Sequence, residues 1–157
     1  MRARPASFGD FKCAHCHVLI SSSQIVSGVH NRNHCPYCLW SCHLDLYAAG
    51  DRLSACKAPM QPVGLTMKMT RNKYQRDSRG ELMLIHQCAD CKTLSINRIA
   101  ADDDSGAVTA VFEESLKRGH QIHSLCQEYG IVMLKSDEAK IVYTQLYGYW
   151  TEIPIIR

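Results

Sequence analysis

Long apolar runs are absent from this sequence of 157 residues, and the longest, such as Ile131–Leu134, span only a few positions. A helix that crosses a bilayer needs about 20 predominantly apolar residues, so no membrane partner is expected. No apolar stretch follows the N-terminal residues Met1–Pro5, and a signal peptide is therefore not predicted. Together these absences predict a cytoplasmic location.

The sequence also lacks a partner for every cysteine, because it contains nine cysteines, an odd number. An odd count disfavours a fully paired disulfide framework, and the cytoplasm keeps thiols reduced. Cysteines in such numbers indicate metal binding. Only Cys126 lies beyond residue 91, so the metal sites are expected in the N-terminal part of the chain.

Acidic residues are scarce in that same part. Residues 1–100 contain 13 lysines and arginines but only 6 aspartates and glutamates, whereas residues 101–157 contain 5 basic and 9 acidic residues. The sequence therefore divides into a basic, cysteine-rich region and an acidic tail. An excess of positive charge indicates an anionic partner for the first region.

Two Cys-x-x-Cys pairs define the first candidate metal site. Cys13 and Cys16 are separated by 18 residues from Cys35 and Cys38, a spacing typical of a zinc ribbon. Each pair places two sulfurs on one side of a tight turn, and two turns surround Zn²⁺ with four thiolates. The neighbouring histidines are expected to lie beside this site without binding the metal: His15, His17 and His34.

A third pair, Cys88-x-x-Cys91, needs two further ligands to complete a second site. The candidates are Cys42, His43, Cys56 and His86. His86 is only two residues from Cys88, which makes joint binding awkward, and adjacent residues such as Cys42 and His43 do not bind together easily. We predict a Cys₃His site made of His43, Cys56, Cys88 and Cys91, and thus two zinc ions in all. The alternative is that Cys42 and Cys56 are buried core thiols.

These patterns predict a small α+β, metal-stabilised fold: a zinc-binding domain at 11–104 and an acidic, mainly helical extension at 105–157. Expected elements of the domain are short strands at 18–20 and 25–29, a short helix at 39–48, irregular chain at 57–64 and a strand at 81–86. Helical spacing recurs at 108–116 and 122–129. Residues 131–150 also favour a helix, although Ile141–Thr144 has strand composition.

The segment Arg32–Ser41 reads RNHCPYCLWS and resembles the bacterial RNHCP domain family, which is named for the first five of these letters. Further matches follow in order: His43-x-Asp45, Gly50-Asp51-Arg52, Cys56, Met60-x-Pro62-x-Gly64, His86-x-Cys88-x-x-Cys91 and Asn97-Arg98-x-x-x-Asp102-Asp103. The resemblance covers about residues 11–104. It implies a small zinc-ribbon-type protein but no activity that could be transferred. Residues 68–80 look like an insertion, the tail like an extension and Cys42 like an additional cysteine.

Basic side chains are concentrated in the 68–80 segment, which also contains a tyrosine. Lysine and arginine contact phosphates, and tyrosine can stack on an unpaired base. The candidate nucleic-acid-binding residues are Arg32, Lys68, Arg71, Lys73, Tyr74, Arg76 and Arg79. We therefore favour an RNA- or ribosome-associated binding module.

Other functions are compatible with the sequence. A protein–protein adaptor would act through residues 105–157, and a metal-dependent nuclease would use His30, His34 and the aspartates. No catalytic motif supports the nuclease, so a binding protein is preferred to an enzyme. Structural roles are an alternative for several charged residues: arginines 32, 52 and 98 could pair with aspartates, and Asp102–Asp104 could begin a helix.

Overall fold

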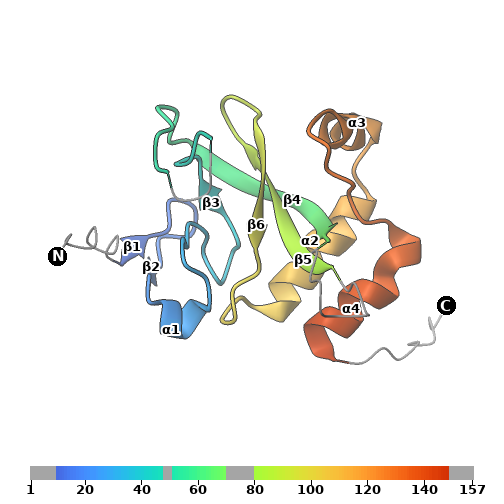
Figure 1. The fold of residues 1–157 in the computed structure, drawn as a ribbon, viewed down its shortest axis with the longest axis horizontal. Helices are drawn as coiled ribbons and strands as arrows, with labels where there is room; N and C mark the ends of the chain where they lie inside the picture. The colour runs from blue at the N-terminus through green and yellow to red at the C-terminus, as the bar shows by residue number, and fades with distance from the viewer. Residues whose placement is uncertain (1–9, 48–50, 70–79, 149–157) are drawn as a thin grey trace.

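The computed structural model describes residues 10–47, 51–69 and 80–148 and has a small α+β architecture (Figure 1). The strands are β1 (Phe11–Lys12), β2 (Leu19–Ile20), β3 (Ser41–Cys42), β4 (Pro59–Lys68), β5 (Glu81–Cys88) and β6 (Leu94–Arg98). The helices are α1 (Gln24–Ser27), α2 (Ser105–Leu116), α3 (His120–Glu128), the 3₁₀ turn η1 (Ser136–Glu138) and α4 (Ala139–Tyr147). Within the described ranges, none of the helices has the length and apolar character needed to cross a bilayer.

A four-stranded antiparallel sheet with the order β3-β4-β5-β6 runs through the middle of the molecule. Its longest pair, β4 and β5, extends from Met60 opposite Cys88 to Lys68 opposite Glu81, with one register shift between Pro62 and Gly64. A separate two-stranded sheet joins β1 to β2 near α1, at the left of Figure 1. The first Cys-x-x-Cys pair lies within this small hairpin, and the third begins at Cys88, the last residue of β5, and continues into the turn before β6.

Strand β4 includes residues 59–64 of the segment 57–64 that was expected to be irregular, so that expectation is wrong. The strand tolerates its prolines because Pro59 is its first residue and because the register shifts between Pro62 and Gly64. The glycine serves a close contact: a Cβ atom there would lie 2.8 Å from the Met133 Cε. Pairing of β4 with β5, and close packing of Gly64 against Met133 in the segment after α3, outweigh the local preference of this sequence for irregular chain.

Two other local expectations are also wrong. The strand expected at 25–29 is replaced by α1, which ends at Gly28, whose φ of 69° allows its N–H to bond the Gln24 carbonyl at 2.8 Å. The helix expected at 39–48 does not form. Leu39 has a φ of 63°, which no right-handed helix accommodates, and β3 then pairs with β4.

The remaining expected elements are present. Strand β2 covers most of the strand expected at 18–20, and β5 includes the one at 81–86. Helices α2 and α3 match the helical spacing of the tail. Helix α4 confirms the helical preference within 131–150.

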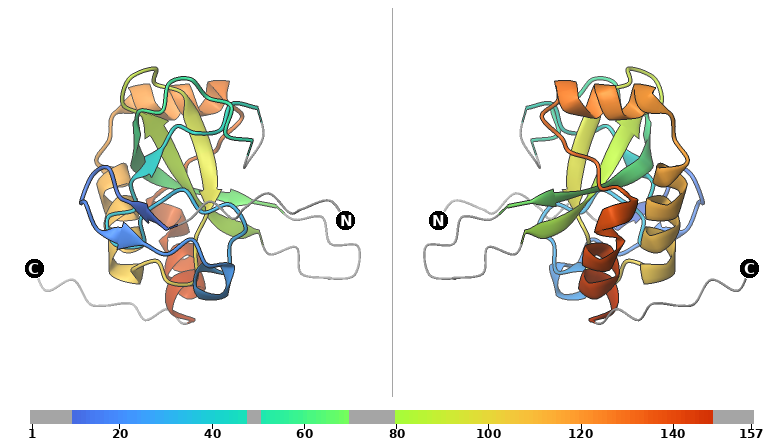
Figure 2. Two further views of the ribbon diagram at one scale, coloured as in Figure 1. Left: turned by 90° about the vertical axis from the view of Figure 1, so that its left-hand side faces the viewer. Right: turned by 90° about the vertical axis from the view of Figure 1, so that its right-hand side faces the viewer.

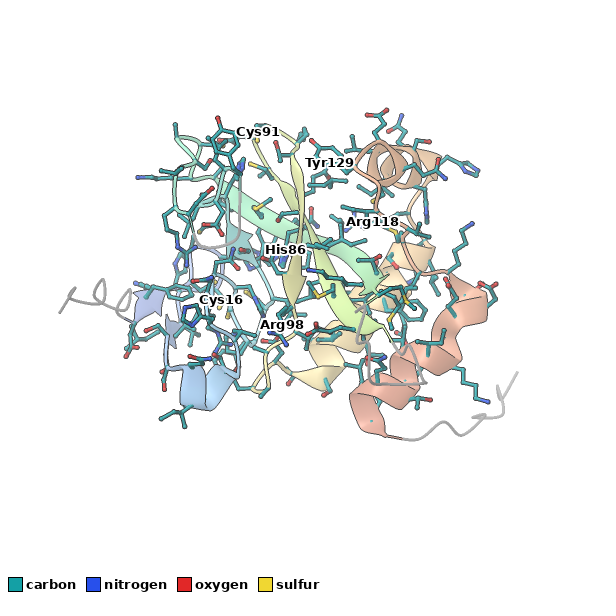
Figure 3. All side chains as sticks on the ribbon, viewed as in Figure 1. Cys16, His86, Cys91, Arg98, Arg118 and Tyr129 are labelled. Atoms are coloured by element: carbon teal, nitrogen blue, oxygen red, sulfur yellow. The ribbon has the colours of Figure 1, made fainter. Side chains whose placement is uncertain are left out.

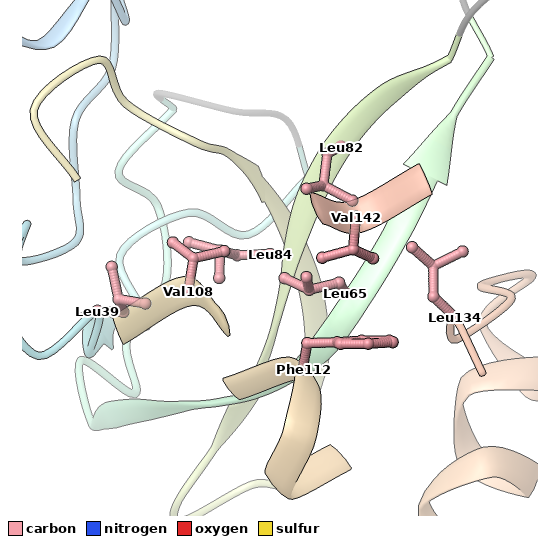
Figure 4. Close-up of a cluster of buried hydrophobic side chains, with 8 residues drawn as sticks. All are labelled: Leu39, Leu65, Leu82, Leu84, Val108, Phe112, Leu134 and Val142. Atoms are coloured by element: carbon pink, nitrogen blue, oxygen red, sulfur yellow. The ribbon is translucent and has the colours of Figure 1, made fainter. Parts of the chain in front are cut away.

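The main hydrophobic cluster joins the two parts of the chain that differ in charge (Figure 4). Its members are 4% exposed or less: Leu39, Leu65, Leu82, Leu84, Val108, Phe112, Leu134 and Val142. Strands β4 and β5 supply three of these side chains, and α2 and α4 supply three more. Helices α2 and α4 and the central sheet therefore share this core.

A second cluster lies on the opposite face of the sheet, because neighbouring residues of a strand point to opposite sides. Leu84 packs in the main cluster, whereas Ile85 packs with Val63, Met133 and Cys126 of α3. Figure 2 shows α3 at the top of both views, apart from α2 and α4. Helices thus cover both faces of the sheet and hold its ends in place for the cysteine-rich loops.

Candidate metal centres

The four cysteines of the first predicted site meet between β1–β2 and the loop before β3. The Sγ atoms of Cys13 and Cys38 are 3.5 Å apart, and those of Cys16 and Cys35 are 3.6 Å apart. All four sulfurs lie within 4.8 Å of one another. Zn–S bonds of about 2.3 Å give a tetrahedron with edges of about 3.8 Å, so the cluster has the size of a zinc site.

The second cluster brings together His43, Cys56, Cys88 and Cys91, also within 4.8 Å of one another. The Cys56 and Cys88 sulfurs are 3.6 Å apart, and the Cys91 sulfur is 3.3 Å from the His43 Nδ1. Two backbone hydrogen bonds hold His43 beside the segment that directly follows Cys56. The His43 N–H donates to the Ala58 carbonyl at 2.8 Å, and the Lys57 N–H donates to the His43 carbonyl at 3.1 Å.

The three Cys-x-x-Cys turns close in the same way. In each, the N–H of the residue after the second cysteine donates to the carbonyl of the first. The bonds are His17 to Cys13 at 3.0 Å, Leu39 to Cys35 at 2.9 Å and Lys92 to Cys88 at 3.2 Å. Backbone N–H groups also point at sulfur, as from Cys16 to the Cys13 Sγ at 3.4 Å. The third turn therefore has the geometry of the two turns in the first cluster.

Unusual backbone conformations occur next to the candidate ligands. Five non-glycine residues in the described part have a positive φ, and four of them directly follow a candidate cysteine: His17, Leu39, Lys57 and Lys92. A left-handed conformation costs a non-glycine residue roughly 1–2 kcal/mol, which the surrounding structure must offset. Metal–thiolate bonds on the preceding residue would provide such an offset.

Ionisation differs sharply among thiols of the same cluster. Burial raises the pKa of Cys35 in the first cluster and of Cys88 in the second. A backbone hydrogen bond lowers the pKa of Cys16 to about 7, and hydrogen bonding with Thr93 lowers that of Cys91 to about 6. Because like charges this close repel, several thiolates can coexist in a cluster only with a compensating cation. Each donor set thus suits a divalent ion that prefers sulfur and nitrogen, as zinc does.

His86 lies apart from both clusters, which Cys16 and Cys91 mark in Figure 3. Its Nε2 is 2.7 Å from the Leu39 carbonyl oxygen, and its Nδ1 is 2.8 Å from the Asn97 Nδ2. Burial, reinforced by the charge of a neighbouring histidine, lowers its pKa to about 3. His86 is therefore a neutral, fully buried residue that supports the loop of the first cluster.

Arg32 and His34 belong to a buried polar network. The Arg32 Nη1 donates to the Asp102 Oδ2 at 2.8 Å, and its Nη2 lies 3.5 Å from the Asp103 Oδ1. The His34 Nε2 is 2.7 Å from the Asp103 Oδ2. Since the Arg32 side chain is only 1% exposed, a phosphate cannot reach it. The expectation that Arg32 contacts nucleic acid is corrected in favour of its structural alternative.

The other charged residues also have structural partners. Arg52 pairs with Asp45 at 3.6 Å, as the structural alternative expects, whereas Arg98 pairs with Glu81 at 2.7 Å and not with an aspartate. Asp104 is the N-cap of α2, and its carboxylate accepts a backbone N–H of the first turn at 2.8 Å. The interpretation of the aspartate run as a helix start is confirmed.

Three residues near the clusters complete their surroundings. The His15 ring stacks on Trp40, with centroids 4.2 Å apart, and neither residue belongs to the two clusters of candidate ligands. Thr93 lies 3.1 Å from the Cys91 sulfur and was not singled out from the sequence. Its only sequence signal is its place two residues after a candidate ligand.

The predicted nucleic-acid-binding residues are only partly described. Lys68 is exposed at the end of β4, opposite Glu81. Five others lie outside the described residues: Arg71, Lys73, Tyr74, Arg76 and Arg79.

Comparison with known proteins gives one match. The sequence model of the RNHCP domain matches residues 8–109, a range that contains all eight candidate metal ligands and ends within α2. No curated protein and no solved structure matches the chain. The match covers well over half of the 157 residues and agrees with the motifs noted in the sequence. The chain therefore belongs to the RNHCP domain family.

Proposed function

We propose that this protein is a non-catalytic binding module in which two structural zinc ions, the first in a zinc ribbon, support an RNA-associated surface. The observation that carries the proposal is the number of protein ligands. Each cluster offers four, which fills the tetrahedral coordination of zinc, whereas catalytic zinc sites keep one position for water or substrate. The proposed setting is the cytoplasm, where reduced thiols stay available for the metal.

The nuclease alternative loses support because several of the side chains that it would use are bonded to other residues of the fold. His34 is 2% exposed and bonded to Asp103, whose side chain is fully buried. Asp102 is held by Arg32, and Asp104 caps a helix. His34 and the three aspartates are thus occupied within the fold, which leaves exposed His30 as the one candidate residue of a nuclease that is not held in this way.

The adaptor alternative rested on apolar residues of the tail, and several of those up to residue 148 pack inward. Val108 and Phe112 belong to the main core, while Ile122, Leu125 and Cys126 pack in the cluster beneath α3. The described part of the tail therefore contributes to the scaffold, which favours the RNA proposal.

The RNA surface is assigned to the connection between β4 and β5. These are the two longest strands, and their paired ends at Lys68 and Glu81 set the base of the connection. The connection itself carries four arginines and lysines, with Asp77 as its one acidic residue. Each phosphate contact by such side chains releases a counterion, so binding should weaken steeply with salt.

The test is a fluorescence titration of single-stranded RNA at low and moderate salt with the zinc-loaded full chain. One variant replaces four basic residues of the connection by glutamine: Arg71, Lys73, Arg76 and Arg79. The matched control replaces four basic residues of the tail: Lys117, Arg118, Lys135 and Lys140. The proposal expects the first variant to lose affinity and salt dependence, with the control close to the native chain. Equal affinity in all three proteins, or no binding by any, would reject it.

A further inference from the structure

A polar cavity of about 230 Å³ lies beside the second candidate metal centre. One wall is β6, with Ser95 and Asn97, and the other is the loop after β3, with His43, Asp45 and Tyr47. Ser95 contacts the Met60 sulfur at 3.8 Å, and Asn97 contacts His86, so both side chains point to the same face of the sheet. The cavity is thus bounded by elements whose positions the metal centre and the sheet determine.

The orientation of the Asn97 amide follows from its neighbours. The Leu39 carbonyl can only accept a hydrogen bond, so the Nε2 of His86 donates to it. The Asn97 Nδ2 lies 2.8 Å from the His86 Nδ1, and because an amide NH₂ group can only donate, that ring nitrogen is the acceptor. The carbonyl oxygen of Asn97 therefore remains as an acceptor in a defined direction.

Asn33 also lines the cavity and is only 8% exposed. Its backbone carbonyl accepts from the Ser41 Oγ at 3.0 Å, but its side-chain amide makes no hydrogen bond with any residue that the structure describes. Neither amide atom of Asn33 is among the fully buried polar atoms that lack a partner, so the amide remains accessible from the cavity. Its donor and its acceptor are therefore both available to a ligand that enters the cavity.

We infer that this cavity binds an unpaired adenine or cytosine, the two bases whose Watson–Crick edge carries an exocyclic amine beside an acceptor ring nitrogen. The inference rests on the RNA proposal and assigns a base-reading site to it. Asparagine pairs with adenine through one donor and one acceptor, and cytosine presents the same combination of an amine beside a ring nitrogen. Asn33 can make this pair, and the Asn97 oxygen accepts the second amine proton.

The charge of the lining selects the base over the phosphate. None of the described residues that line the cavity is lysine or arginine, and the acidic residue of the lining, Asp45, is paired with Arg52, so the lining offers a phosphate no lysine or arginine partner. Exposed Leu46 and Tyr47, the latter 85% exposed, lie at the mouth, where an aromatic ring can stack on a base. Phosphates are thus left to the basic β4–β5 connection, while the cavity takes the base.

The test uses nucleosides, which carry no phosphate and so bypass the basic connection. Cytidine or adenosine is added to the ¹⁵N-labelled, zinc-loaded full chain, and side-chain amide resonances are followed by NMR. We expect the Asn33 and Asn97 signals to shift with cytidine or adenosine and much less with uridine. Asn33→Ala should weaken the binding about tenfold. The same change at exposed Asn31, two residues away, should leave it unaltered.

Stability separates this role from a structural one. Because the Asn33 amide makes no hydrogen bond within the described structure, Asn33→Ala should retain both zinc ions and the native unfolding midpoint. Asn33→Asp, which keeps the volume but removes the amide donors, should weaken nucleoside binding as well. No shift with any nucleoside, or equal weakening by the Asn31 and Asn33 variants, overturns the cavity assignment. Salt-sensitive RNA binding that persists in that case would leave the RNA proposal standing.

Discussion

Three consecutive aspartates, Asp102 to Asp104, give a sharp test of the energetics because the structure assigns each a different environment. Replacing Asp103 by alanine removes a carboxylate that accepts from His34 at 2.7 Å and from the Ala100 N–H at 2.8 Å. The side chain is fully buried beside Arg32. Removing one member of a buried, hydrogen-bonded ion pair leaves its partners without a counter-charge, which costs about 3–5 kcal/mol.

The flanking aspartates should cost less. Asp104→Ala removes an exposed N-cap, so about 1 kcal/mol of stability should be lost. Asp102→Ala removes one charged hydrogen bond, but the side chain is 27% exposed and its Oδ1 has no partner among the described residues. After discounting for solvent, we expect about 1–2 kcal/mol.

The assay is urea unfolding followed by circular dichroism, with two equivalents of zinc present for every variant. Each substitution removes the same group and one negative charge, so the three proteins are mutual controls for net charge. The expected order of destabilisation is Asp103 first, then Asp102, then Asp104. A loss under 1 kcal/mol for Asp103→Ala, or a loss as large for Asp104→Ala, would refute the argument from burial.

The remaining predictions concern zinc content, backbone strain and the shared core. Elemental analysis should give two zinc ions per chain for the native protein and for His86→Ala, but one zinc ion for His43→Ala. Loss of zinc from the His86 variant alone would contradict the ligand assignment. Lys92→Gly should raise unfolding stability by about 1 kcal/mol by relieving its positive φ, whereas Lys140→Gly within α4 should lower it by a similar amount. Phe112→Ala should cost about 3–5 kcal/mol in urea unfolding, and a near-neutral result would show that α2 is not part of the core.

The candidate metal ligands could be predicted because their pattern is local. A Cys-x-x-Cys turn is a four-residue unit, and its sulfurs converge whatever the rest of the chain does. The choice of His43 and Cys56 needed two further arguments, that His86 is too close to Cys88 and that the adjacent residues Cys42 and His43 do not bind together. The structure places all four predicted members of each set in contact range.

Features that depend on distant pairing could not be predicted in the same way. Asp103 is distinguished from Asp104 largely by contacts with Arg32 and His34, about 70 residues earlier in the chain. Prolines in β4 argued for irregular chain, but pairing with β5 overrides their preference. Asn33 and Asn97 have no spacing that marks a cavity, since an amide can serve a turn, a cap or a ligand equally well.

In the three Cys-x-x-Cys turns, the residue that follows the second cysteine is under different structural constraints. At Leu39 the backbone favours glycine, yet the side chain is fully buried in the main cluster and its carbonyl bonds His86. Glycine would relieve roughly 1–2 kcal/mol of strain but would open a cavity costing about 2–5 kcal/mol. His17 and Lys92 are exposed and carry no such penalty. Among related sequences, substitution by glycine should therefore be common at those two positions and rare at Leu39, where the metal-binding turn and the hydrophobic core must evolve together.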